Sequence, residues 1–165
     1  MTRTLILMRH AKSSWNALAA TDHARPLNDW GRRSAKALGN WLRAIDRIPD
    51  QVISSSSART RETFAGLEIV VAGDFADALY HAGPEQMHRV LAHASGQTVL
   101  ILGHNPGIAE FAESLIRQSA AHPRFHQYPT GATLVAEFDI ENWDQLEPGT
   151  GTVVDFIVPR DLIDE

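Results

Sequence analysis

The stretch Thr4-Leu5-Ile6-Leu7-Met8 is a continuous apolar run, and Arg9-His10-Ala11 follows it directly. A run of this length without polar alternation is typical of a strand that is covered on both faces of a sheet. It therefore predicts a buried first strand that ends with an arginine and a histidine side by side. A fixed positive charge next to an imidazole suits phosphoryl chemistry, provided that further charges complete the site.

Further runs of strand length follow, and helical patterns separate most of them. The predicted strands cover Thr4–Met8, Gln51–Ser54, Ile69–Val71, Thr98–Leu102, Thr133–Phe138 and Thr152–Val158. The predicted helices cover Asp29–Ile45, with Asn28 as the N-cap, Ala58–Ala65, Pro84–Ala94, and Pro106–Arg117, with Pro106 in the first helical position. This alternation predicts an α/β fold, a three-layer α/β/α sandwich around a mostly parallel sheet.

Two connections depart from the alternation. The last two runs are joined by Glu141–Gly151, which contains Pro148-Gly149, so we expect a hairpin and hence an antiparallel edge. The segment Ser119–Thr130 predicts a long loop, and loops of this length are often functional or mobile.

Composition limits the classes of protein. The 165 residues predict one domain, residues 1–165, and 44% hydrophobic residues suffice for an ordinary core. The absence of cysteine excludes disulfides and a thiol nucleophile, and the net charge of −5 argues against nucleic-acid binding. No apolar run approaches the roughly 18 residues of a membrane span, and no signal peptide is apparent. We expect a cytoplasmic protein that does not bind membranes.

The carboxyl ends of the predicted parallel strands carry polar residues that suit phosphate. Because ligands bind at this edge of an open sheet, the residues that follow three of the strands should converge there. These residues are Arg9 and His10, the serine run with Arg59, and His104. Each arginine can offer two parallel hydrogen bonds to phosphate oxygens, and a neutral imidazole can attack phosphorus. His104 could hold another oxygen, best when protonated.

Four motifs in this order resemble the histidine phosphatase superfamily, which is also called phosphoglycerate-mutase-like. They are Leu7-Met8-Arg9-His10-Ala11, Arg25-Pro26-Leu27-Asn28-Asp29-Trp30-Gly31, Ser55-x-x-x-Arg59-x-x-x-Thr63 and Gly103-His104-Asn105-Pro106. In its short length and its Gly-His-Asn-Pro motif, the chain resembles the small bacterial phosphohistidine phosphatase branch of this superfamily. The resemblance spans about residues 3–158 and implies the phosphoglycerate-mutase-like fold.

The resemblance implies a role for each matching residue. His10 would be the phosphorylated nucleophile, while Arg9, Arg59 and His104 would form the phosphate pocket. Ser55 occupies the family's serine position, although Ser56 replaces the proline that often follows. Asn16, on the loop after His10, is a further candidate for a phosphate contact.

No residue in the sequence is an obvious proton donor for the leaving group. Larger relatives use a Glu or Asp, which one branch carries directly after the second histidine, where this chain has Asn105. The candidates are Asp22, His81 and Glu85. A missing acid matters least for phosphohistidine, because its P–N bond breaks easily once protonated, and most for an alkyl phosphate. The expected substrate is therefore phosphohistidine on a protein, such as a phosphorelay domain.

Other assignments remain open at this point. A small phosphorylated molecule is the alternative substrate, and a phosphate sensor with little turnover is the alternative class of protein. We expect no metal and no organic cofactor, because two arginines beside the histidines would repel a dication.

Overall fold

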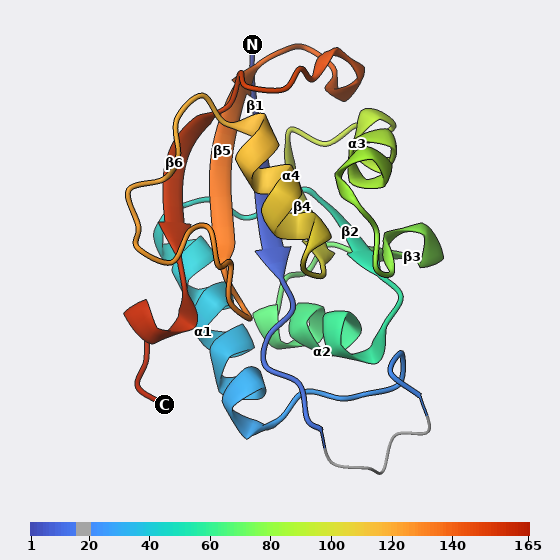
Figure 1. Cartoon of the computed structure of the whole chain (residues 1–165), viewed down its shortest axis with the longest axis vertical. Coiled ribbons are helices and arrows are strands. Elements are labelled where there is room, and N and C mark those ends of the chain that lie inside the picture. The colour runs from blue at the N-terminus through green and yellow to red at the C-terminus, as the bar shows by residue number, and fades with distance from the viewer. Residues whose placement is uncertain (16–20) are drawn as a thin grey trace.

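The computed structural model of the protein describes residues 1–15 and 21–165 (Figure 1). The strands are β1 (Thr2–Arg9), β2 (Gln51–Ser55), β3 (Gly73–Ala76), β4 (Thr98–Gly103), β5 (Thr133–Asp139) and β6 (Thr152–Ile157). The α-helices are α1 (Asp29–Ala44), α2 (Ala58–Leu67), α3 (Pro84–Ala92) and α4 (Gly107–Leu115). Short 3-10 helices cover Asp77–Leu79, Trp143–Gln145 and Pro159–Asp161. None of the helices in the described ranges has the length and apolar character that crossing a bilayer requires.

The strands form one six-stranded sheet in the order β3-β2-β4-β1-β5-β6. The pairs among β1, β2, β3 and β4 are parallel. β5 runs antiparallel to β1, and β6 runs antiparallel to β5. The prediction of a mostly parallel sheet with an antiparallel edge hairpin is confirmed.

Helices cover both faces of this sheet. Leu5 and Leu7 of β1 belong to a core that also contains side chains of α3 and α4. Ile6 and Met8 point to the other face, where they join a core with side chains of α1 and α2. Figure 1 shows α4 crossing in front of β1 and β4. The predicted three-layer sandwich is confirmed, because β1 is buried on both faces as its unbroken apolar run indicated.

Two boundary predictions are wrong. The apolar run Ile69–Val71 is not a strand: the side chain of Val70 is fully exposed, and Ile69 and Val71 pack against the core from a loop. The strand that pairs with β2 is β3 (Gly73–Ala76), which begins two residues after this run ends. An apolar run can thus cover a core without entering the sheet.

The second correction concerns α4. Pro106 is the N-cap of this helix, after a cis peptide bond, and the first helical residue is Gly107. At the other end, Ile116 leaves the helix with extended backbone and forms an isolated bridge with Gly151. The apolar periodicity continues through Ile116 because its side chain is still buried, although its backbone is no longer helical.

The start of α1 packs closely against the loop that carries His10. Asn28 is the N-cap, as predicted, and its side-chain oxygen accepts a hydrogen bond from the Gly31 amide at 2.8 Å. A Cβ atom on Gly31 would lie 2.1 Å from the carbonyl oxygen of Lys12, which is far inside van der Waals contact. Glycine at this position therefore allows the helix to approach the loop.

Candidate active site

The register of β1 and β4 brings the two histidines of the site together. Arg9 pairs with Gly103 in the parallel ladder, so the next residue on each strand, His10 and His104, leaves the sheet at the same level. The centroids of the two imidazole rings lie 5.3 Å apart. Both rings are nearly buried, with residue exposures of 5% and 2%.

The contacts of His10 define which nitrogen carries its proton. Nδ1 lies 2.7 Å from the carbonyl oxygen of Ala11. Because a carbonyl oxygen only accepts, Nδ1 must hold the hydrogen, and Nε2 keeps its lone pair when the ring is neutral. Burial lowers the pKa of His10 to about 3, and the charges of Arg9 and Arg59 reinforce this shift. At neutral pH His10 is therefore an uncharged imidazole with a free lone pair on Nε2.

His104 is held between an arginine and a serine. Nη2 of Arg59 donates to Nδ1 of His104 at 3.3 Å, and Nε2 of His104 lies 2.8 Å from the Oγ of Ser55. Since an arginine can only donate, Nδ1 is unprotonated and Nε2 carries the hydrogen. Burial, followed by the neighbouring His10 and Arg59, lowers the pKa of His104 to about 3. This differs from the expectation of a protonated His104, because the buried site disfavours a further positive charge.

The sequence pattern around Ser55 builds the N-terminus of α2. The side chain of Ser57 caps the helix by accepting from the amide of Thr60. Arg59 lies in the first turn and is 2% exposed. Thr63, one turn later, donates to the carbonyl of Arg59 and accepts from the amide of Ala11 at 3.0 Å. Thr63 thus joins the helix that carries Arg59 to the loop that carries His10.

The long segment 119–130 positions Arg9 from the other side. Tyr128 is completely buried, and its hydroxyl donates to the carbonyl of Leu7 and accepts from the amide of Leu134. The carbonyl oxygen of Tyr128 accepts from Nη1 of Arg9 at 3.2 Å and from Nδ2 of Asn105 at 3.0 Å. This part of the loop is therefore fixed to the sheet, and it holds two residues of the pocket.

Asp22 is the centre of a polar cluster on the rim, which we call the Asp22 network (Asp22, Arg25, Arg59, Tyr80 and His81). Its carboxylate accepts hydrogen bonds from Arg25 at 3.0 Å, from Arg59 at 3.1 Å and from the Tyr80 hydroxyl. Nε2 of His81 lies 3.2 Å from the same carboxylate. The hydrogen bond from Tyr80, with the two arginines, holds the pKa of Asp22 well below its usual range. Asp22 is therefore ionised and has no proton to give.

The Asp22 network also borders the histidine pair. The centroid of the His81 ring lies 4.1 Å from that of Tyr80, with the rings tilted by 38°, and 5.2 Å from that of His104. Its backbone has a φ of 54°, in the left-handed region that non-glycine residues seldom adopt. The side chain of His81 is 53% exposed, so it stands at the entrance of the pocket.

A pocket of about 390 Å³ lies between these elements. Its lining comprises Arg9, His10, Lys12, Ser13, Trp15, Asp22, Arg25, Arg59, His81, His104, Asn105 and Thr130. Within the described ranges, Nε of Arg9 and Nε of Arg59 are buried without a hydrogen-bond partner. Both arginines line the pocket, and each keeps an unpaired donor there or beside it, as suits a site for an anion. Residues 1–15 and 21–165 contain no group of three His, Asp or Glu side chains arranged to hold a metal ion.

The predicted site residues differ in where they lie relative to the pocket. The structure brings Arg9, His10, Arg59 and His104 together around the pocket, with Asp22 and His81 on its rim. Ser55 is fully buried behind His104 and binds that ring, so it positions His104 and does not line the pocket. Glu85, in the first turn of α3, is exposed and is also absent from the lining. Asn16 lies outside the described residues.

Sequence reasoning missed several residues of the site. Lys12, Asn105 and Arg25 line the pocket, and Tyr80 and Tyr128 hold pocket residues in place. Lys12 was recognisable as a cation two positions after His10. The two tyrosines carried no local signal, because their partners are distant in the sequence.

Comparison with known proteins identifies the family of the chain. The family model described as histidine phosphatase superfamily (branch 1) matches residues 5–72. An uncharacterized protein of Mycobacterium tuberculosis is 35% identical over 162 residues, which cover 93% of this chain and 100% of that protein.

Solved structures show the same relationship. A protein of Nakamurella multipartitia assigned as the phosphohistidine phosphatase SixA is 31% identical, with a TM-score of 0.86 and coverage of 96% of this chain and 97% of that one. An Agrobacterium tumefaciens protein with the same assignment is 25% identical, with a TM-score of 0.77 and coverage of 95% and 98%. The chain thus belongs to the histidine phosphatase superfamily, in its small bacterial branch of SixA-like proteins.

Proposed function

We propose that the protein is a phosphatase that forms a covalent phosphohistidine on His10 and that its substrate is phosphohistidine on another protein. The observation that carries the proposal is the state of His10. The hydrogen bond to the Ala11 carbonyl keeps the Nε2 lone pair free, and burial keeps the ring neutral. A buried neutral imidazole between two arginines is poised to attack phosphorus.

In the proposed first step, Nε2 of His10 forms a bond to phosphorus as the bond to the leaving group breaks. The leaving group departs with that electron pair and takes up a proton. Arg9 and Arg59 stabilise the charge on the equatorial oxygens. In the second step a water oxygen attacks phosphorus, the P–N bond to His10 breaks, and phosphate is released. The two guanidinium groups supply the positive charge that a metal would otherwise supply, so no metal or cofactor enters these steps.

Among the three candidate donors, we assign the proton transfer to His81. Asp22 is held ionised, and Glu85 does not line the pocket. His81 lines the pocket, and its Nε2 lies 3.2 Å from the Asp22 carboxylate, which orients the imidazole at the entrance. His81 gives this proton to the leaving group in the first step and regains it from the attacking water in the second.

The absence of a carboxylic acid among the assigned donors supports phosphohistidine as the substrate. An imidazole leaving group needs far less help from an acid than an alkoxide does. The likeness to proteins assigned as phosphohistidine phosphatases points to the same class of substrate. A protein surface can approach the entrance of the pocket at His81, since half of that side chain is exposed.

The nucleophile is tested by rapid quench with a ³²P-phosphohistidine phosphocarrier protein. We expect an acid-labile, base-stable label on the native enzyme and none on His10→Ala. His93→Ala, an exposed histidine at the C-cap of α3, is the matched control and should label normally. Full labelling of His10→Ala would overturn the assignment.

The substrate class is tested by comparing kcat/KM for the phosphohistidine protein with kcat/KM for sugar phosphates. Faster turnover of the phosphohistidine protein supports the proposal, and faster turnover of the sugar phosphates refutes that substrate. Binding of phosphate without turnover of any donor would make the protein a sensor instead.

His81 is tested with esters that differ in their leaving group. For His81→Gln we expect kcat/KM for an alkyl phosphate, which reports the first step, to fall about 100-fold, whereas kcat/KM for p-nitrophenyl phosphate should change little. Equal losses on both esters would exclude His81 as the proton donor.

A further inference from the structure

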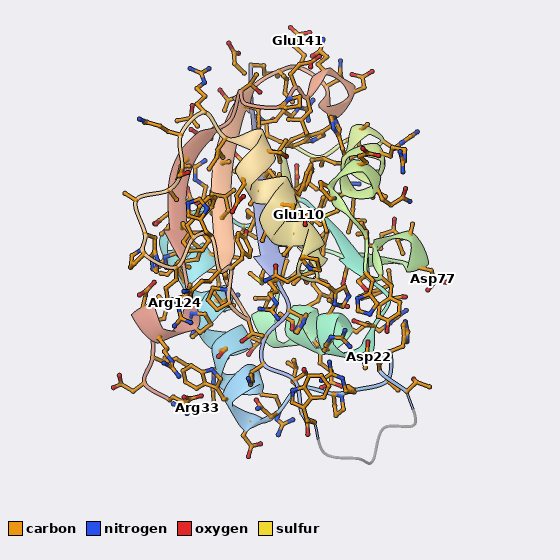
Figure 2. The ribbon with its side chains drawn as sticks, in the orientation of Figure 1. Asp22, Arg33, Asp77, Glu110, Arg124 and Glu141 are labelled. Atoms are coloured by element: carbon orange, nitrogen blue, oxygen red, sulfur yellow. The ribbon has the colours of Figure 1, made fainter. Side chains whose placement is uncertain are left out.

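A second cavity adjoins the catalytic pocket on the side away from Asp22. Its volume is about 300 Å³. Arg9, Lys12 and Thr130 line both cavities, so the two are adjacent and share these three residues as a wall. Figure 2 shows Asp22 and Arg124 on opposite sides of the end of β1. Asp22 lines the catalytic pocket, and Arg124 lines the second cavity. The second cavity therefore lies beside the catalytic pocket, across the wall of Arg9 and Lys12.

The charges of this cavity are unbalanced. We define the basic annex as the part of its lining made by Lys12, Trp30, Arg124 and Arg160, which come from four separate segments of the chain. Among the residues that the structure describes, Glu165 is the one carboxylate in this lining. The chain as a whole carries a net charge of −5, so a cluster of cations at this place is against the general trend. Such a cluster creates a positive potential at the mouth of the site.

The contacts of these cations leave them available to an external anion. Nε of Arg124 donates to the side chain of Gln127 at 3.0 Å, which is a neutral partner. Arg160 pairs with Glu165 at 2.8 Å, but the two side chains are 62% and 54% exposed. An exposed pair of this kind contributes little, so a carboxylate from solution can replace Glu165 at small cost.

We propose that the basic annex is a second anion subsite that binds an acidic side chain of the phosphoprotein substrate, beside the phosphohistidine that enters the catalytic pocket. This inference rests on the proposed function and adds the feature by which one phosphoprotein is preferred to another. A carboxylate held by Arg124 and Arg160 would align the substrate along the shared wall of Arg9 and Lys12. Because these contacts are exposed, they should affect KM and the association rate more than kcat.

The test uses two phosphohistidine proteins that differ only in the acidic residues around the phosphorylated histidine, Glu and Asp in one and Gln and Asn in the other. For the native enzyme we expect kcat/KM to be about tenfold higher for the acidic substrate at low salt, with the preference shrinking at high salt. In the double variant Arg124→Gln, Arg160→Gln the preference should fall below about twofold. Its rate on p-nitrophenyl phosphate should not change.

Arg89→Gln is the matched control. Nε of Arg89 donates to the side chain of Gln86 at 3.1 Å, as Arg124 does to Gln127, but Arg89 lies on α3 outside both cavities. This variant should keep the full preference for the acidic substrate. A preference that survives in the double variant, or that Arg89→Gln removes equally, overturns the proposal.

A second arm distinguishes a protein carboxylate from that of a small molecule. A phosphate ester that bears a carboxylate is compared with its methyl ester, on the native enzyme and on the double variant. If the double variant lost its preference for the carboxylate ester over the methyl ester but kept its preference for the acidic phosphoprotein, the phosphoprotein assignment would be overturned and the annex would be a small-molecule subsite. If the native enzyme hydrolyses the esters but no phosphohistidine protein, the proposed substrate fails, and this arm still reports on the annex.

Discussion

The two sides of the active-site mouth hold their cations in opposite ways. In the Asp22 network one carboxylate binds two arginines, a tyrosine and a histidine. In the basic annex the arginines meet a glutamine and an exposed glutamate. Arg25 and Arg59 are themselves largely buried against their shared carboxylate and are held in one place, whereas the exposed Arg160 stays available to a ligand. We infer that the first side maintains the geometry of the site and the second side selects what enters it.

The largest effect should come from removing the charge at the centre of the Asp22 network. In Asp22→Asn, Arg59 loses the carboxylate that orients it. The Arg59 side chain is only 3% exposed, so water cannot replace that partner. We expect kcat/KM for p-nitrophenyl phosphate to fall about 100-fold. Asp29→Asn, which removes the carboxylate from an exposed pair with Arg32, is the control and should be neutral. Equal rates for the two variants would show that the network has no role in the site.

A smaller loss should follow Tyr80→Phe. The hydroxyl of Tyr80 is the main cause of the lowered pKa of Asp22. Without it that pKa rises, so Asp22 becomes protonated at higher pH. We expect about a tenfold loss in kcat/KM, and the acidic limb of the pH profile should move to higher pH. An unchanged acidic limb would mean that the charge of Asp22 does not support activity.

Between the two sides, the buried histidine pair should make stability depend on pH. In the unfolded chain a histidine takes up a proton below about pH 6.5, but the pKa values of folded His10 and His104 lie at about 3. Since the unfolded state binds more protons in this range, the free energy of unfolding falls as the pH decreases from about 6.5 to about 3.

This dependence is measured as the thermal midpoint against pH. In His104→Gln the midpoint should fall less steeply between those pH values than in the native protein. His93→Gln, on an exposed residue, should leave the slope as it is. If the midpoint of His104→Gln depended on pH as steeply as that of the native protein, the lowered pKa of folded His104 would be contradicted.

The smallest effect belongs to Glu165→Gln in the cavity beside the site. Because the pair with Arg160 is exposed, the free energy of unfolding should change by less than about 0.5 kcal/mol in urea denaturation. Removing this carboxylate should raise kcat/KM for the acidic phosphoprotein by about twofold, since the substrate no longer competes with it. A decrease would indicate that Glu165 supports the site.

The residues that sequence alone brought to one place follow the ends of strands. Arg9, His10 and His104 were predictable because parallel strands align their carboxyl ends and because apolar runs mark the strands. The same reasoning misplaced Ile69–Val71, since an apolar run records burial and does not record which neighbour supplies the hydrogen bonds.

The parts that sequence could not predict depend on contacts between distant segments. Asp22 and Tyr80 are 58 positions apart, and the bond between them decides that Asp22 is a counter-charge and not an acid. Tyr128 meets Leu7 across 121 positions, which makes segment 119–130 part of the site's support. No local pattern around Tyr128 indicated this role, since its buried partners belong to the sheet.

The register in which Arg9 opposes Gly103 has a consequence for how this sequence can change. Backbone hydrogen bonding between β1 and β4 sets the spacing of the two histidines. Sequence changes outside these strands therefore leave that spacing as it is. A single inserted or deleted residue within either strand would turn every following side chain to the opposite face. We expect lineages of this protein to keep the lengths of β1 and β4 constant, while loops that do not support the site change in length.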